Sequence, residues 1–172
     1  VHFASRDAMN IDGLGPAIVT ALIESNLISD AADLYTITKE QLLELEGFKD
    51  KSAENLIRAI AATKNMPLDR VIFALGIRNI GQKAASLLCS HFGSLEAIET
   101  AMPDDFSEIA GFGDVMAENL YTALHDSNVR RLLLRLKEAG LSMEYEKPEI
   151  SENAFFSGKN FVLTGTLTRM KR

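Results

Sequence analysis

The chain has 172 residues, of which 47% are hydrophobic and 24% are charged, and its formal net charge at pH 7 is −6. This is the composition of a globular protein, and it excludes a disordered or collagen-like chain. No run approaches the roughly 18 consecutive apolar residues that a membrane span requires, and the sequence does not open with a secretory signal, so we expect no membrane partner.

Cysteine and histidine are too sparse for a disulfide or a metal site. Cys89 is the single cysteine, so it can form no disulfide within the chain. The three histidines are scattered along the sequence and lack the spacing of metal ligands. We therefore expect a reducing, cytoplasmic setting and no metal bound by this chain.

Short helices are predicted for most of residues 1–143, and several have recognisable ends. Thr38 and Gln41 predict a capping box at the start of one helix. Gly140 is expected to end the last helix in a left-handed conformation. Because most of these helices span only two or three turns, they must be stabilised by packing against one another. Further helix starts are predicted at Asp50, Pro67, Ser94 and Ser127.

The composition changes near residue 145. Residues 144–153 are acidic, contain Pro148 and show no helical spacing of apolar residues, which is typical of a linker. Residues 160–164 are predicted to form a buried strand followed by a glycine turn. We therefore divide the chain into a helical domain at 1–143, an acidic linker at 144–155 and a strand-bearing segment at 156–172.

A repeat with a period of 32 to 34 residues runs through the helical region. Its pattern is apolar–x–Gly–apolar–Gly, and each copy leads into a helix. Six of the eleven glycines fall in the two glycine columns, which is too many for incidental turn residues. Repetition at this spacing indicates stacked helical units that share a core. The copies, called hairpins 1 to 4 below, lie at residues 11–17, 45–51, 77–83 and 109–115 and form two pairs.

The residue types of this repeat suit a turn that binds an anion. The first glycine can take a positive φ, and Asn79, which replaces it in hairpin 3, tolerates the same geometry. The central apolar residue is expected to point inward, and the second glycine lets a ligand approach the backbone. The helix behind it presents unpaired N–H groups and the positive end of its dipole, which favour phosphate. Backbone amides add no formal charge, so the acidic composition does not exclude a nucleic-acid partner.

The repeated turn resembles the helix-hairpin-helix motif of DNA-repair and replication proteins. Four copies in two pairs are similar to the tandem helix-hairpin-helix domain of bacterial NAD-dependent DNA ligases. Residues 2–15 resemble the segment that follows the zinc finger of these ligases, and residues 156–167 resemble the first strand of their BRCT domain. The resemblance covers essentially the whole chain. It implies an all-α fold of four hairpins in two pairs, followed by one β-strand of an incomplete BRCT domain.

The resemblance also implies a function. The chain is expected to bind double-stranded, nicked DNA without sequence specificity, as the DNA-binding part of a ligase in replication and repair. The full-length parent would use NAD, magnesium and zinc, whereas no cofactor and no catalytic residue are expected in this fragment. Asn10 stands where the Lys-x-Asp-Gly motif of nucleotidyl transferases needs its lysine nucleophile. We expect a monomer in the bacterial cytoplasm, associated with the nucleoid and unable to ligate DNA alone.

Carried onto the hairpins, the resemblance assigns DNA contacts to two kinds of residue. For each glycine the alternative is that it only ends a helix, and this alternative weighs most on hairpin 2, where Glu44 and Glu46 are unfavourable to phosphate. Arg130, Arg131 and Arg135 can equally bind DNA or simply solvate their helix. The amide contacts are assigned to Gly13, Gly15, Gly47, Gly81, Gly111 and Gly113, and the charge contacts to Lys49, Lys51, Arg78 and Lys83.

Two other interpretations stay open at this level. The tandem hairpins can belong to another repair protein, such as an excision nuclease or a junction-binding protein. Small helical repeats of this kind also serve as protein-interaction modules. The BRCT-like tail favours the ligase, and the salt dependence of DNA binding separates a DNA-binding domain from an interaction module.

Overall fold

The computed structural model describes residues 1–146 of the chain. Within that range the fold is all-α, as predicted, and its one β-type pairing is an isolated bridge between Ser94 and Glu144. The predicted β-strand lies outside the described residues. Every helix between residues 1 and 146 is too short or too polar to cross a bilayer. The α-helices are α1 (Pro16–Glu24), α2 (Lys39–Leu43), α3 (Asp50–Ala62), α4 (Leu68–Ala74), α5 (Gln82–Phe92), α6 (Leu95–Thr100), α7 (Pro103–Ser107), α8 (Asp114–His125) and α9 (Ser127–Glu138), with 3₁₀-helices η1 (Ala32–Thr36) and η2 (Thr63–Asn65).

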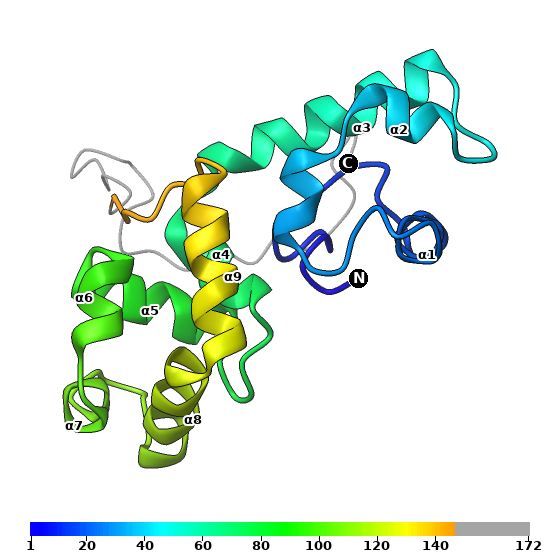
Figure 1. The fold of residues 1–172 in the computed structure, drawn as a ribbon. Helices are drawn as coiled ribbons and strands as arrows, with labels where there is room; N and C mark the ends of the chain where they lie inside the picture. Colours follow the sequence, from blue (N-terminus) through cyan, green and yellow to red (C-terminus); the bar gives the residue numbers. More distant parts are fainter. Residues whose placement is uncertain (147–172) are drawn as a thin grey trace, which may run out of the picture.

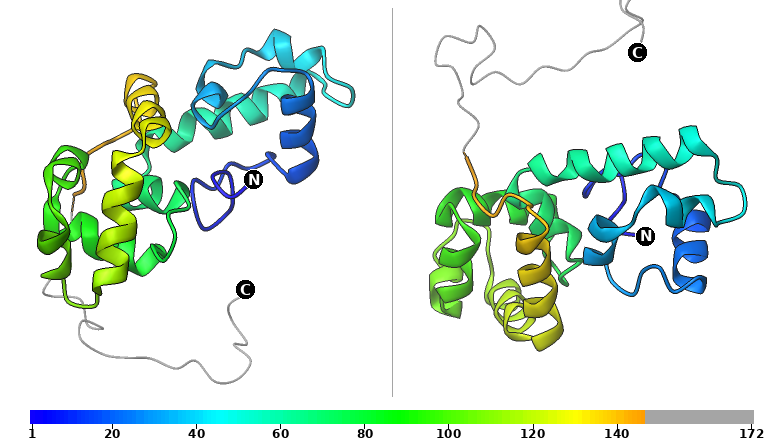
Figure 2. Two further views of the ribbon diagram at one scale, coloured as in Figure 1. Left: turned by 60° about the horizontal axis from the view of Figure 1, so that its bottom comes forward. Right: turned by 45° about the horizontal axis from the view of Figure 1, so that its top comes forward.

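The helices form two hairpin pairs, and the last helix of the described residues, α9, packs between them. Hairpins 1 and 2 lead into α1 and α3, and hairpins 3 and 4 lead into α5 and α8. Figures 1 and 2 show the first pair, in blue to cyan, on one side of the molecule and the second, in green, on the other. The last helix, α9, lies between them. The two pairs are therefore neighbours in one body.

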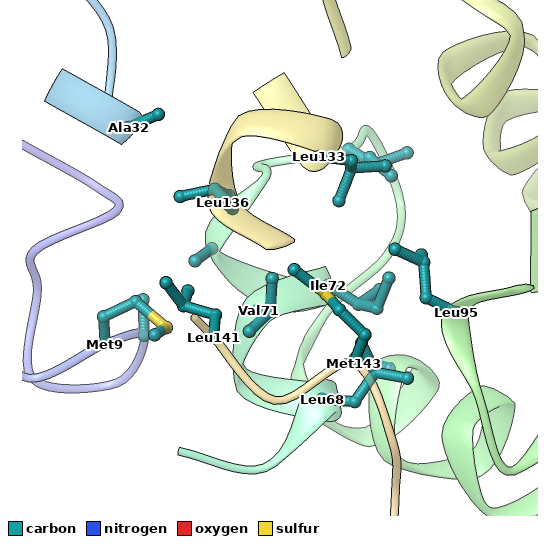
Figure 3. Close-up of a cluster of buried hydrophobic side chains, with 14 of the residues drawn as sticks. Met9, Ala32, Leu68, Val71, Ile72, Leu95, Leu133, Leu136, Leu141 and Met143 are labelled. Atoms are coloured by element: carbon teal, nitrogen blue, oxygen red, sulfur yellow. The ribbon is translucent and has the colours of Figure 1, made fainter. Parts of the chain in front are cut away.

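A single hydrophobic core runs through both pairs. Met9 from the N-terminal segment, Val71 from α4 and Leu136 from α9 are all buried in one continuous cluster. Figure 3 shows Met9 facing the side of the cluster that holds Leu136 and Leu141. Because short helices are marginal alone, this shared core is what fixes one pair against the other.

Three of the predicted helix ends are confirmed. Thr38 Oγ1 accepts a hydrogen bond from the Gln41 N–H at 3.3 Å, and Gln41 Oε1 accepts from the Thr38 N–H at 2.9 Å, which completes the capping box. Ser94 Oγ accepts from the Ala97 N–H at 3.2 Å at the start of α6. Gly140 follows α9 with φ +91°, in the left-handed region.

Other predicted ends are shifted by one residue. Asp50 is the first residue of α3 rather than its cap, because its carboxylate pairs with Lys39 Nζ at 2.9 Å. Asp126 caps α9 in place of Ser127, since its carboxylate accepts from two first-turn N–H groups. At α9 the two neighbouring side chains are alternative caps for the same N–H groups, and the Asp126 carboxylate is the one that accepts from them. The helix after Pro67 begins at Leu68, as predicted.

Hairpin 1 differs from the others because no regular helix precedes its turn. Residues 2–9 form consecutive tight turns, and Asn10 then takes a positive φ of 50°. The Asn10 N–H donates to Ser5 O at 2.9 Å, and the Ile11 N–H donates to Ala4 O at 3.1 Å. The helix-hairpin-helix resemblance implies a helix on both sides of every turn. That expectation was wrong for hairpin 1, where residues 2–9 form turns instead.

The chain stays attached to the second pair beyond residue 143. The Leu95 N–H donates to Met143 O at 2.9 Å, and the Tyr145 N–H donates to Gly93 O at 2.8 Å. The rest of the predicted linker at 144–155, and all of the segment at 156–172, lie outside the described residues, so these boundaries stay predictions.

Candidate nucleic-acid interface

The four turns share one backbone geometry. The residue in the first glycine column has a positive φ in all four turns, including Asn79 in hairpin 3. In each copy the N–H of the central apolar residue donates to the carbonyl three residues earlier, at 2.8 to 3.2 Å. The repeat is thus a structural repeat, and the left-handed conformation is what its first column requires. The φ values are +81° at Gly13, +88° at Gly47, +67° at Asn79 and +92° at Gly111.

The central residue of each turn points into the core. Leu14, Ile80 and Phe112 are buried, with exposed fractions of 6%, 3% and 6%, and Phe48 is half-buried. The residues on either side of them are exposed in every copy. Each turn is therefore pinned from inside by its apolar residue while its backbone faces solvent.

Within residues 1–146 the glycines of the second column are neither strained nor crowded. Gly81 and Gly113 have φ values of −85° and −96°, which any residue can adopt. A Cβ added at either position would meet no atom within 4 Å. Lys49 occupies the equivalent position of hairpin 2 with an ordinary extended backbone. Neither strain nor crowding within residues 1–146 demands glycine at these positions, which leaves the backbone there open to a close approach from solvent.

The helices behind these glycines begin without a side-chain cap. At Gly15, Gly81 and Gly113 no side chain accepts from the first-turn N–H groups of α1, α5 and α8. Most of those N–H groups lack a partner in the helix, although the Met116 N–H of α8 donates to Gly113 O at 2.8 Å, and they lie at the positive end of the helix dipole. In α1 the first residue is Pro16, so that helix offers one donor fewer.

All ten predicted contact residues are exposed. The four cations, Lys49, Lys51, Arg78 and Lys83, make no ion pair with any residue from 1 to 146. Lys39 neutralises two carboxylates beside hairpin 2, since its Nζ lies 2.9 Å from Asp50 and 2.6 Å from Glu54, whereas Glu44 and Glu46 form no ion pair within residues 1–146. The hydrogen bond from Lys39 lowers the pKa of Asp50.

Hairpin 3 is bound directly to the segment that leads into hairpin 1. Gln82, the first residue of α5, donates from Nε2 to Asp7 O at 3.0 Å. Arg70 on α4 donates from Nη1 to the same oxygen at 2.7 Å and to Ala8 O at 3.1 Å. These bonds fasten the N-terminal segment of the first pair to α4 and α5 of the second. Hairpins 2 and 4 lie at opposite ends of the molecule (Figures 1 and 2).

Two helix-hairpin-helix families match the chain, one for each pair. The SAM-like helix-hairpin-helix tandem matches residues 5–62, and the helix-hairpin-helix motif matches residues 70–133. Over its full length the chain is 44% identical to a DNA ligase of Anoxybacillus flavithermus, 47% identical to one of Symbiobacterium thermophilum and 43% identical to one of Bacillus cereus. The chain carries a tandem of helix-hairpin-helix units and is similar along its full length to part of these DNA ligases. It spans 26% of the length of each of these relatives.

Arg135 is already engaged within the fold. Its guanidinium pairs with Asp30 at 2.5 Å and with Asp33 at 2.6 Å. These ion pairs join α9 to the connector of the first pair, the segment between α1 and α2. Burial opposes ionisation of Asp33, but hydrogen bonds from Arg135 and from the Ser29 N–H lower its pKa far below the ordinary value. Of the three arginines of α9, Arg135 therefore has a structural role, whereas Arg130 and Arg131 are exposed.

Two residues that join the hairpin pairs were not recognised in the sequence. Arg70 lies between the repeats, and Gln82 was noted only as part of hairpin 3. Their partners are backbone carbonyls 62 to 75 residues away, and no local pattern encodes such a pairing. The one available signal in the sequence was that the polar residue Gln82 directly follows the second glycine of hairpin 3.

Proposed function

We propose that the chain binds duplex DNA without sequence specificity, through contacts between phosphates and the exposed amides of its hairpins. The observation that carries the proposal is the second glycine column. Gly15, Gly81 and Gly113 are exposed, unstrained and uncrowded, and each directly precedes an uncapped helix. A phosphate resting on the backbone gives these positions the steric reason that the fold does not.

Amide binding accounts for the acidic net charge. Backbone N–H groups donate to phosphate without contributing a formal charge, and hydrogen bonds to a charged group are the strong ones. Lys49, Lys51, Arg78 and Lys83 add the cationic component. For four such contacts the slope of log K against log salt is about −3.6, at about −0.9 for each phosphate. A binder of equal affinity that relied on a basic patch would show a steeper slope.

The relatives supply the setting for this activity. They are named DNA ligases, and we propose that the chain is the part of such an enzyme that holds a nicked duplex during replication and repair. NAD, magnesium and zinc would serve other parts of the parent. We expect the chain alone to be a monomer that ligates no DNA, with residues 144–155 as a linker and 156–172 as the start of a BRCT domain.

A salt titration on a nicked duplex tests the proposal. We expect binding at low salt with the shallow slope given above, on duplexes of unrelated sequence alike. An intact duplex of the same sequence measures whether the nick is preferred. If the chain failed to bind any duplex at low salt, the hairpins would instead be a protein-interaction module.

A further inference from the structure

Val115 is an exposed valine in the turn of hairpin 4. Its side chain is 67% exposed, a value that Val1 equals and that no other exposed large apolar residue between 1 and 146 reaches. The remaining members of that set, such as Met102 and Leu134, lie outside the four turns, as Val1 does. Val115 is therefore the large apolar side chain that a hairpin turn presents most openly to solvent.

The repeat places Val115 where two other hairpins carry a cation. Two residues after the second glycine column stand Ala17 in hairpin 1, Lys51 in hairpin 2, Lys83 in hairpin 3 and Val115 in hairpin 4. Hairpin 4 has neither Lys nor Arg within residues 109–115. A phosphate at this turn would be bound by amides without a cation, so any further attraction has to come from an uncharged contact.

The free amides of hairpin 4 belong to Asp114 and Val115, whose N–H groups have no acceptor within residues 1–146. The next N–H of α8, that of Met116, donates to Gly113 O at 2.8 Å. The Asp114 carboxylate does not cap the helix, and it accepts from Ser107 Oγ at 3.4 Å instead. Val115 therefore offers a free amide and an exposed apolar side chain on the same residue.

We propose that Val115 packs against a deoxyribose next to the phosphate that hairpin 4 binds. This inference rests on the proposed function, and it gives hairpin 4 an apolar contact in place of the cation of hairpins 2 and 3. Each DNA phosphate is bonded to a sugar on either side, so a phosphate on the Val115 amide brings sugar C–H groups to that residue. Sugar carbons are the same in every nucleotide, and the contact therefore carries no sequence preference.

The first test is Val115→Thr, which keeps the shape of the side chain and exchanges one methyl group for a hydroxyl. We expect about fourfold weaker binding to a nicked duplex, with the wild-type slope of log K against log salt because no charge changes. The loss should be equal on nicked duplexes of A·T pairs alone and of G·C pairs alone. Val1→Thr is the matched control, since Val1 is equally exposed and lies outside the turns, and it should bind like the wild type.

The second test, Val115→Lys, examines the location of the residue independently of the apolar contact. If residue 115 lies beside a phosphate, a lysine there repeats the arrangement of Lys51 and Lys83. The slope of log K against log salt should then become steeper by about 0.9. Val1→Lys adds the same charge outside the turns and should leave the slope unchanged.

The outcomes separate this proposal from the proposed function. If the wild-type chain binds no duplex at low salt, the proposed function fails. If the wild type binds and Val115→Thr binds equally well, the sugar contact is overturned while DNA binding stands, and Val115 faces water or a protein partner. A loss confined to one base composition overturns it in favour of a base contact, and a wild-type slope for Val115→Lys overturns the location. An equal loss on both duplexes together with the steeper lysine slope supports the proposal.

Discussion

Arg135 Nη2 lies 2.6 Å from Asp33 Oδ1, and this pair joins the last helix to the connector of the first hairpin pair across 102 residues of sequence. The same guanidinium also reaches Asp30. Because both carboxylates lie in the first pair and Arg135 follows the second, the cluster adds a polar contact between the pairs to the core that they share. The relative placement of the hairpins is therefore supported by a contact that touches none of their turns.

Removal of this arginine should loosen the joint. Arg135→Ala leaves two partly buried carboxylates without their partner, and we expect the melting temperature to fall by roughly 2 to 5 °C. Calorimetry measures the change, and Arg131→Ala on the exposed side of the same helix is the control. An unchanged melting temperature for Arg135→Ala would show that the core alone holds the pairs together.

The same cluster predicts a loss of stability in acid. Folding lowers the pKa of Asp33, so its contribution is present above the ordinary value of 3.8 and is lost as the pH falls below that value toward the folded-state pKa. In Arg135→Ala the pKa of Asp33 returns toward its ordinary value, and the fall in melting temperature between about pH 5 and pH 3 should be smaller than in the wild type. Equal acid dependence in the two proteins would contradict this assignment.

The two glycine columns should respond differently to alanine. At Gly81 and Gly113 alanine fits the backbone and meets open space, so stability should be unchanged or slightly higher. The added methyl groups keep phosphate from the amides, and each variant should lose about tenfold in DNA affinity with no change in salt slope. Gly111→Ala is the contrast, because its φ of +92° makes alanine cost about 1 kcal/mol of stability. Denaturant melts and binding titrations on the same samples separate the two effects.

The cations of hairpin 2 should act through charge alone. Lys49→Gln combined with Lys51→Gln removes two exposed cations that have no ion-pair partner within residues 1–146. The salt slope should become shallower by about 1.8, with stability nearly unchanged. Lys137→Gln controls for net charge, because Lys137 lies on α9, outside the hairpin turns, in a groove that Glu96 and Glu99 also line. A wild-type slope in the double variant would place hairpin 2 outside the DNA interface.

Asp69 is expected to destabilise the fold at neutral pH. Its Oδ1 is buried and accepts no hydrogen bond from any described residue, and burial raises the pKa of the carboxyl group. A raised folded-state pKa means that the group favours folding at low pH and that this contribution is lost as the pH rises through that pKa. Asp69→Asn should therefore gain about 1 kcal/mol over the wild type near pH 7 and little near pH 4. Urea unfolding at the two pH values measures the gain, and an equal difference at both would contradict the explanation.

Much of the candidate site was predictable because its signals are local. The positive φ of the first column and the inward central residue follow from residue type and from the position before a helix. Thr38 and Gln41 determined their capping box for the same reason, since the two side chains interact only with each other's backbone. Asp50 and Ser127 were misplaced as caps because a competing partner lay nearby, and that competition is decided by geometry rather than by residue type.

The sequence by itself determined the repeat, its period, the all-α class and the chemistry of each turn, because these depend on residues that are close along the chain. Only the tertiary structure showed that the second-column glycines are neither strained nor crowded within residues 1–146. It also decided that Arg135 pairs with Asp30 and Asp33. The bonds from Gln82 and Arg70 that join hairpin 3 to the N-terminal segment were likewise visible only there. Those facts depend on which distant atoms share the space around one hydrophobic core. No pattern of neighbouring residues encodes that arrangement, because it is set by the packing of the whole core.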